Sequence, residues 1–214
     1  MKELVEKRGN YQIKYYEIEV TSEMKEKALK FACDIILSGN QYPRLLPEQV
    51  LKSNDIKLKN KIEIQRTYMG KLGELAFLKY LNELSIYPNT DDMFIIYEGQ
   101  DKVDSFDFIT PTEETIDVKT GFRTIHQKLL VNLEQFNGKA KNYYVAVKLN
   151  TRDIDSNLKL VDWDSVTVAK ILGYAEYNYL KKNCKIKNFG EGDAKYLEYN
   201  RLLGIDKLIK KYFK

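Results

Sequence analysis

The side chains best suited to chemistry in this 214-residue chain are two aspartates and a lysine that interrupt neighbouring apolar runs. Asp107 stands between two phenylalanines, and Asp117 and Lys119 lie on either side of Val118. A charge inside an otherwise apolar strand is costly unless it is paired or binds a metal. The three side chains therefore suggest a metal-dependent hydrolytic site.

The two apolar runs are predicted to form a charged hairpin over residues 104–120, with a polar turn around Pro111. Because side chains alternate across a strand, the two-residue spacing places Asp117 and Lys119 on one face. Asp107 shares that face if it lies opposite Asp117, which requires a loop of odd length. We predict a three- or five-residue turn around residues 111–113, or a bulge. A four-residue turn would place Asp107 opposite Val118 and would weaken the metal hypothesis.

The pattern acid-x-Lys carries little information by itself. It occurs four times, about as often as the composition gives by chance, at Glu23/Lys25, Asp55/Lys57, Asp117/Lys119 and Asp193/Lys195. We expect only the third pair to lie in a strand. A solvated hairpin with a surface Asp–Lys pair is the alternative that the spacing leaves open.

A third acid, Glu74, lies within a helix predicted for residues 61–84. Helical spacing places it on or beside the apolar stripe formed by Phe77, Leu78 and Leu81. A carboxylate in that position needs a partner, unless it is a boundary glutamate that reaches water. Gly70 and Gly73 would let the helix approach another element closely, at a cost of about 1 kcal/mol each in helix propensity.

The composition is that of a globular protein with modest positive charge. Hydrophobic residues make up 43% and charged residues 31%, and the net charge of +4 permits nucleic-acid binding without requiring it. Most of the basic residues are lysines, so Arg66 and Arg123 are better candidates than any single lysine for reading bases. Cys33 and Cys184 have no C-x-x-C partner, which argues against a thiolate zinc site. With no apolar core typical of a signal peptide and no run near the ~20 residues that span a bilayer, we expect a cytoplasmic protein without a membrane segment.

Strands and helices are predicted to intermix without regular βαβ repetition, which favours an α/β fold with a mixed sheet. Residues 1–60 are interpreted as an N-terminal strand–helix extension and residues 61–214 as the core with a C-terminal helix. Strands are expected at 11–20, 93–97, 129–131, 143–149, 165–174 and 195–199 besides the hairpin. Helices are expected at 24–37, 61–84, 132–137, 174–183 and 202–213.

The acidic helix, the strand aspartate and the Asp-x-Lys strand together resemble the PD-(D/E)xK nuclease superfamily, over roughly residues 65–180. Glu74 matches the helix acid, Asp107 the first strand acid, and Asp117 and Lys119 the second acid and the lysine. Phe106 stands where a proline is usually written. Gln135 matches a glutamine often found on the following helix, where it would support the lysine or touch the phosphate backbone.

The resemblance implies a restriction-endonuclease-like core, with a central four- or five-stranded mixed β-sheet flanked by helices. It also implies a divalent-metal site for Mg²⁺, with Mn²⁺ as a substitute. Asp107, Asp117 and the Val118 carbonyl would hold the metal, with Glu74 acting directly or through water. The catalytic set implied by the resemblance is Glu74, Asp107, Asp117, Lys119 and Gln135.

The function expected from this resemblance is a Mg²⁺-dependent DNA endonuclease of restriction or defence type, acting on double-stranded DNA as a homodimer. The alternatives are a structure-specific repair or recombination nuclease of the junction-resolvase kind, and a catalytically inactive nucleic-acid-binding protein on the same fold. His126, the only histidine, is interpreted as a loop residue. Arg123, Lys128, Lys139 and Lys141 could line a DNA groove.

Overall fold

The architecture is that of a computed structural model, which describes residues 1–8, 11–39, 46–97, 106–190 and 192–213. Asp104 and Ser105, the first two residues of the predicted hairpin, lie outside the described residues. None of the helices in the described part of the chain has the length and apolarity needed to cross a membrane.

Six strands among the described residues form one mixed sheet, in the order β1-β2-β9-β6-β4-β3. The β4–β6 pair is parallel, and the other neighbouring strands are antiparallel. The mixed α/β class predicted from the sequence is confirmed. The strands are β1 (Lys2–Arg8), β2 (Tyr11–Glu19), β3 (Phe108–Ile109), β4 (Thr115–Gly121), β6 (Tyr143–Leu149) and β9 (Val168–Glu176).

The expected number of four or five strands was too low because β1 was not recognised. Its sequence is mostly charged, and it lies at the edge of the sheet with β2 as its neighbour. Edge strands tolerate charge because part of their surface faces water, so they lack the apolar alternation by which a strand is recognised. The strand expected at residues 93–97 was also wrong, since residues 91–94 form a turn that buries Met93.

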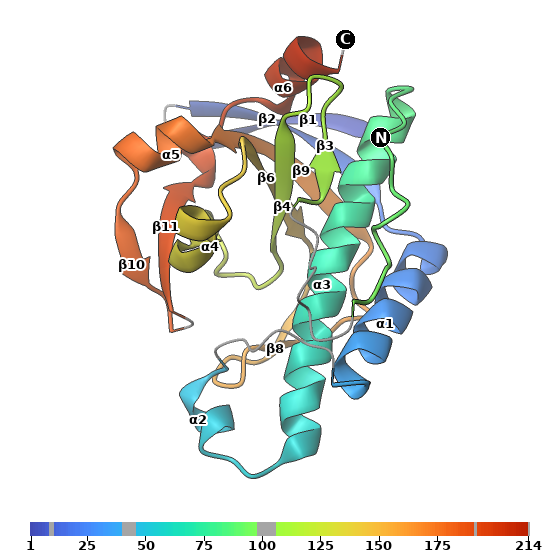
Figure 1. Ribbon diagram of the computed structural model, residues 1–214, viewed down its shortest axis with the longest axis vertical. Helices are drawn as coiled ribbons and strands as arrows, with labels where there is room; N and C mark the ends of the chain where they lie inside the picture. The colour runs from blue at the N-terminus through green and yellow to red at the C-terminus, as the bar shows by residue number, and fades with distance from the viewer. Residues whose placement is uncertain (9–10, 40–45, 98–105, 191, 214) are drawn as a thin grey trace.

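Helices α1 (Ser22–Leu37) and α3 (Ile56–Glu83) cover one face of the sheet and pack on each other (Figure 1). Both begin at side-chain caps, because the side chain of Thr21 accepts the N–H of Met24 and that of Asp55 accepts the N–H of Leu58. The core on this face includes Tyr143, Val145 and Val147 of β6 and Ile116 and Val118 of β4. Within the first 60 residues, β1, β2 and α1 thus belong to the same sheet and core.

The opposite face of the sheet is covered by smaller elements, which include a three-stranded sheet in the order β10-β11-β5 (Figure 1). Tyr144 and Ala146 of β6 join the apolar cluster on this side, together with Phe136 and Leu180. The elements here are β5 (Lys128–Asn132), α4 (Leu133–Gly138), α5 (Tyr177–Asn183), β10 (Ile186–Asn188) and β11 (Asp193–Glu198). The chain also contains α2 (Glu48–Leu51), β7 (Asp153–Asp155), β8 (Leu160–Val161), η2 (Tyr199–Arg201) and α6 (Ile205–Tyr212).

Candidate active site

The β3–β4 hairpin has the register that brings its two aspartates together. Phe108 pairs with Ile116 and Ile109 with Thr115, so the loop between the strands contains residues 110–114. This five-residue loop has the odd length predicted from the sequence. Continuing the register by one residue places Asp107 across from Asp117. The four-residue turn that would have separated them is therefore excluded.

Asp107 is fixed against β4 through its backbone and its side chain. Its N–H donates to the carbonyl of Ile116 at 3.0 Å, and its Oδ2 accepts the N–H of Val118 at 2.6 Å. The short hydrogen bond to Val118 holds the Asp107 carboxylate against β4, just before β3 begins. A side-chain acceptor that replaces a strand carbonyl in this way has little freedom to turn into solvent.

The electrostatic surroundings of Asp107 show that the predicted acids converge. Burial raises the pKa of Asp107 well above its ordinary value, and the negative charges of Glu74 and Asp117 raise it further. The N–H of Val118 and the charge of Lys119 oppose this shift. Glu74 comes from α3, whereas Asp117 and Lys119 come from β4. The fold therefore gathers residues from α3 and β4 around the carboxyl group of Asp107.

Lys119 bridges the hairpin to α4. Its ammonium lies 2.7 Å from Oδ2 of Asp117 and donates to Oε1 of Gln135 at 3.2 Å. Gln135 is held in place because Asn132 caps α4, accepting the backbone N–H groups of Glu134 and Gln135. The glutamine thus supports the lysine, one of the two roles expected from the resemblance.

Glu74 has a partner on its own helix that sequence reasoning missed. Lys71, one turn earlier, lies 2.6 Å from the Glu74 carboxylate and also donates to the carbonyl of Met93 at 2.8 Å. The same ammonium sits over the rings of Phe31 and Phe94, at 4.8 and 5.6 Å. The sequence signal that could have revealed this ion pair is its spacing: Lys71 lies three residues before Glu74, so the two side chains are neighbours on the helix surface.

Gly73 allows α3 to approach β4 closely, as predicted. A Cβ at this position would lie 1.9 Å from Oγ1 of Thr120 and 3.0 Å from its Cβ. Gly70 does not share this role, because a Cβ there would meet nothing within 4 Å. The contact between Gly73 and Thr120 brings Glu74, the next residue of the helix, to the strand that carries Asp117 and Lys119.

The expectation that only Asp117 and Lys119 form an acid-x-Lys pair within a strand was wrong. Asp193 and Lys195 both lie in β11. Asp193 is exposed, however, and Lys195 donates to backbone carbonyls at the end of α5, including that of Leu180 at 3.3 Å. The two pairs differ in their neighbours, which the local pattern does not encode.

Lys141 is a further cation near the acids, in the segment that leads into β6. Burial lowers the pKa of Lys141, and the positive charges of Lys119 and Lys139 act in the same direction. The negative charges of Asp117 and Asp107 oppose the shift, so the lysine lies within electrostatic reach of the acids. From the sequence, Lys141 was only one of several basic residues that could line a DNA groove.

His126 and Arg123, two other residues singled out from the sequence, make hydrogen bonds within the protein. Nδ1 of His126 accepts the backbone N–H groups of Phe122 and Arg123 at 3.1 and 3.3 Å, which fits the loop role expected for it. Arg123 is only 6% exposed, and its Nη2 donates to the carbonyl of Ser156 at 3.3 Å. Its interpretation as a base-reading arginine was therefore wrong, because the guanidinium is directed into the protein.

The carboxylates are suited to a divalent metal by their chemistry rather than by their present arrangement. Within the part of the chain that the structure describes, no group of three or more His, Cys, Asp or Glu side chains is placed to hold a metal ion. Instead, Asp117 is ion-paired with Lys119, and Glu74 is ion-paired with Lys71. The repulsion that Glu74 and Asp117 impose on Asp107 is nevertheless what a cation would relieve, and carboxylate oxygens are preferred ligands of Mg²⁺.

Comparisons with known proteins leave the family open. No protein-family model, curated protein or solved structure matches this chain. The functional interpretation therefore depends on the geometry of the site.

The raised pKa of Asp107 predicts a specific pH dependence of stability. Because its pKa in the folded protein exceeds the ordinary value of about 3.9, folding takes up a proton between the two pKa values. The stability that protonated Asp107 contributes is complete below pH ~3.9 and is lost as the pH rises through the folded-state pKa. Asp107→Asn keeps an acceptor for the Val118 N–H but removes the charge. We expect this variant to be more stable than the wild type at pH 7, by a margin that shrinks as the pH falls.

Urea unfolding in EDTA between pH 4 and pH 8 measures this margin, with the exposed Asp193→Asn as the matched control. The groups that face Asp107 are Glu74 from α3, Asp117 and Lys119 from β4, and Lys141 from the segment before β6. A margin that does not change with pH would show that Asp107 is not held among like charges.

Proposed function

We propose that this chain is a divalent-metal-dependent phosphodiesterase that cleaves DNA, as an endonuclease of restriction or defence type. The observation that carries the proposal is the convergence of Glu74, Asp117 and Lys119 on the Asp107 carboxyl group. Three acids with one lysine suit phosphodiester hydrolysis, because the reaction needs a metal to neutralise the phosphate and a cation to stabilise the developing charge.

The order of elements supports the same proposal. A long helix with an acid, a hairpin with an acid and Asp-x-Lys, and a following helix with a glutamine come in the order expected of a restriction-endonuclease-like core. The parallel β4–β6 pair and the antiparallel β6–β9 pair give the mixed sheet that such a core requires. Membership of the PD-(D/E)xK superfamily remains part of the proposal.

The side chains would have distinct roles. Asp107 and Asp117, with the Val118 carbonyl and with Glu74 directly or through water, would hold Mg²⁺ or Mn²⁺. Such a metal, when bound, lowers the pKa of a coordinated water and neutralises phosphate charge. Lys119 would orient the attacking water or offset negative charge on the phosphate, and Gln135 would keep the Lys119 ammonium in place. Because Lys119 also holds Asp117, the metal would compete with it for that carboxylate.

A cleavage assay tests the proposal directly. The purified protein is incubated with supercoiled plasmid, single-stranded DNA and branched DNA, in Mg²⁺, in Mn²⁺ and in EDTA. We expect cleavage in either metal, none in EDTA, and none by Asp117→Ala. Preference for branched DNA would instead favour the junction-resolvase alternative. Failure to cleave any substrate, together with no Mn²⁺ bound at Asp107 and Asp117, would refute an enzymatic role.

The proposal includes a homodimer, because cutting both strands of a duplex commonly uses two active sites. A dimer should convert supercoiled plasmid to the linear form with little nicked intermediate, and should show twice the chain mass in light scattering. A monomer that only nicks plasmid would contradict this part of the proposal without affecting the chemistry.

A nucleic-acid-binding protein without catalysis is the second candidate. The ion pairs Lys71–Glu74 and Lys119–Asp117 favour it, because each neutralises a carboxylate that a metal would need. This candidate predicts DNA binding that is unchanged by EDTA and unaffected by Asp117→Ala.

A further inference from the structure

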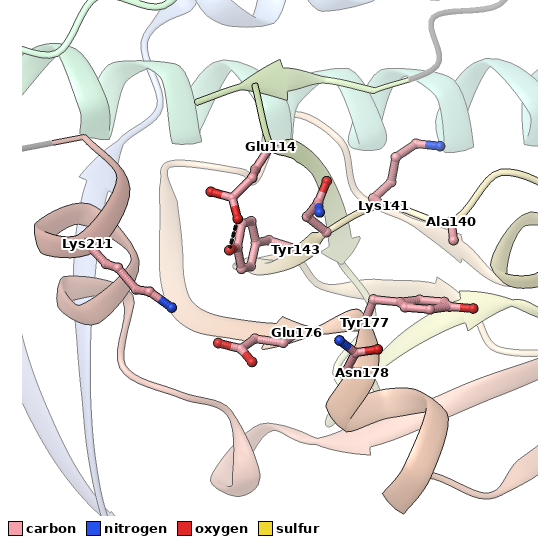
Figure 2. Close-up of a pocket in the computed structure, with 9 residues that line it drawn as sticks. Glu114, Ala140, Lys141, Tyr143, Glu176, Tyr177, Asn178 and Lys211 are labelled. Atoms are coloured by element: carbon pink, nitrogen blue, oxygen red, sulfur yellow. Dashed lines mark hydrogen bonds between the residues drawn. The ribbon is translucent and has the colours of Figure 1, made fainter. Parts of the chain in front are cut away.

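A polar cavity of about 360 Å³ adjoins the candidate site at the start of β6 (Figure 2). Its walls include Glu114, Lys141 and Tyr143 on one side and Glu176, Tyr177 and Asn178 on the other. Tyr143 pairs with Ile116 of β4 and with Glu176 of β9, so the cavity lies one residue along β4 from Asp117. Its size is in the range of cavities that hold small molecules, about 300–1,000 Å³.

The polar side chains on the two sides of the cavity differ in whether they have hydrogen-bond partners within the protein. Both oxygens of Glu114 are used, since Tyr143 donates to one at 2.8 Å and Thr112 to the other at 2.9 Å. Among the described residues, the side chains of Glu176 and Asn178 make no hydrogen bond or ion pair. The half-buried Glu176 carboxylate therefore has acceptor oxygens that a hydrogen-bond-donating ligand can use.

The aromatic wall is rigid and connected to the candidate site. The ring of Tyr177 stacks on Phe136 at a centroid distance of 4.7 Å, and Phe136 follows Gln135 on α4. The backbone N–H of Tyr177 donates to the carbonyl of Asn142 at 3.0 Å, which ties the start of α5 to the segment before β6. These contacts fix the position of the α5 N-terminus, which carries Glu176 and Asn178, relative to α4.

Lys141 connects the cavity to the acids. Lys141 lines the cavity, and its side chain points away from Glu176 and Lys211 in Figure 2. Its charge interacts with those of Asp117, Asp107 and Lys119. A phosphate beside Lys119 would therefore be within the field of Lys141, and the adjoining nucleotide could extend into the cavity.

We propose that this cavity receives one unpaired guanine nucleotide next to the phosphate that is cleaved, an inference that rests on the proposed nuclease function. Guanine presents two adjacent N–H donors on its pairing edge, which match the two oxygens of the Glu176 carboxylate. The Asn178 amide can donate to guanine O6. Thymine lacks an exocyclic amino group and presents a carbonyl oxygen that the carboxylate would repel. The chain is therefore specific for unpaired or extruded guanine at the cleavage position.

Nucleotide binding tests the inference without requiring cleavage. Isothermal titration of the full-length protein with dGMP and with dTMP, in EDTA, is expected to show dGMP binding at least about ten-fold tighter, as a bidentate base contact predicts. Glu176→Gln should remove that preference, whereas Glu26→Gln, an exposed glutamate on α1, should retain it. Equal binding of the two nucleotides, no binding of either, or a preference unchanged in Glu176→Gln would overturn the inference.

The cleavage assay separates this inference from the proposed function. If dGMP binds selectively but no DNA is cut, the guanine site stands and the nuclease proposal fails. If DNA is cut without guanine preference by both the wild type and Glu176→Gln, the nuclease proposal stands and the guanine site is rejected.

Discussion

Asp117→Asn is expected to lower metal-dependent DNA cleavage by at least about 100-fold, the effect typical of losing a group that stabilises charge in the transition state. The substitution removes a carboxylate that faces Asp107 and that Lys119 holds at 2.7 Å. Asparagine retains the size of the side chain, so the hairpin register should be preserved. Rates measured at saturating DNA and Mg²⁺ give the change in kcat.

A second measurement on the same variant does not depend on catalysis. The charge of Asp117 raises the pKa of Asp107, so its removal should lower that pKa. Carboxyl NMR titration of Asp107 in EDTA follows the change. Asp193→Asn is the matched control, because it alters the acid of the other strand-borne acid-x-Lys pair at an exposed position. A cleavage rate or an Asp107 pKa that responds equally to both substitutions would contradict the proposed site.

Gly73→Ala is expected to destabilise the protein by about 1–3 kcal/mol, the usual cost of inserting a methyl group into a close-packed contact. The new Cβ would lie 1.9 Å from Oγ1 of Thr120. Rotation of the threonine hydroxyl does not remove the conflict, because the Thr120 Cβ and Cγ2 atoms both lie 3.0 Å away. Either α3 or β4 must therefore shift. The shift would separate Glu74 from the β4 residues, so cleavage should also fall.

Gly70→Ala provides the control on the same helix. Nothing lies within 4 Å of the added Cβ, and alanine is favoured over glycine in a helix by up to about 1 kcal/mol. We expect this variant to unfold at a higher urea concentration than the wild type and to keep its activity. If both alanine variants change stability in the same direction, the close approach of α3 and β4 at Gly73 is not what the structure indicates. The double variant Gly73→Ala/Thr120→Ala should recover part of the loss, because the nearest atom is removed.

The sequence by itself determined many of the local elements, and it limited the hairpin loop to an odd length if its two aspartates share a face. Apolar periodicity located α1, and the dense apolar run at residues 143–149 located a central strand. The odd loop length followed from the requirement that Asp107 and Asp117 share a face, and the five-residue loop fulfils it. These properties depend on neighbours close in the chain, so a single sequence contains the information.

Only the tertiary structure decided which charged residues act together. Asp193 and Lys195 have the spacing of Asp117 and Lys119 and also lie in a strand, yet α5 carbonyls take the lysine and the aspartate faces water. Lys71, Lys141 and the burial of Arg123 were equally hidden, because each depends on segments distant in sequence. The energy of a charged side chain is set by its burial and by the charges within a few ångströms. Long-range packing fixes both, and local sequence patterns do not encode it.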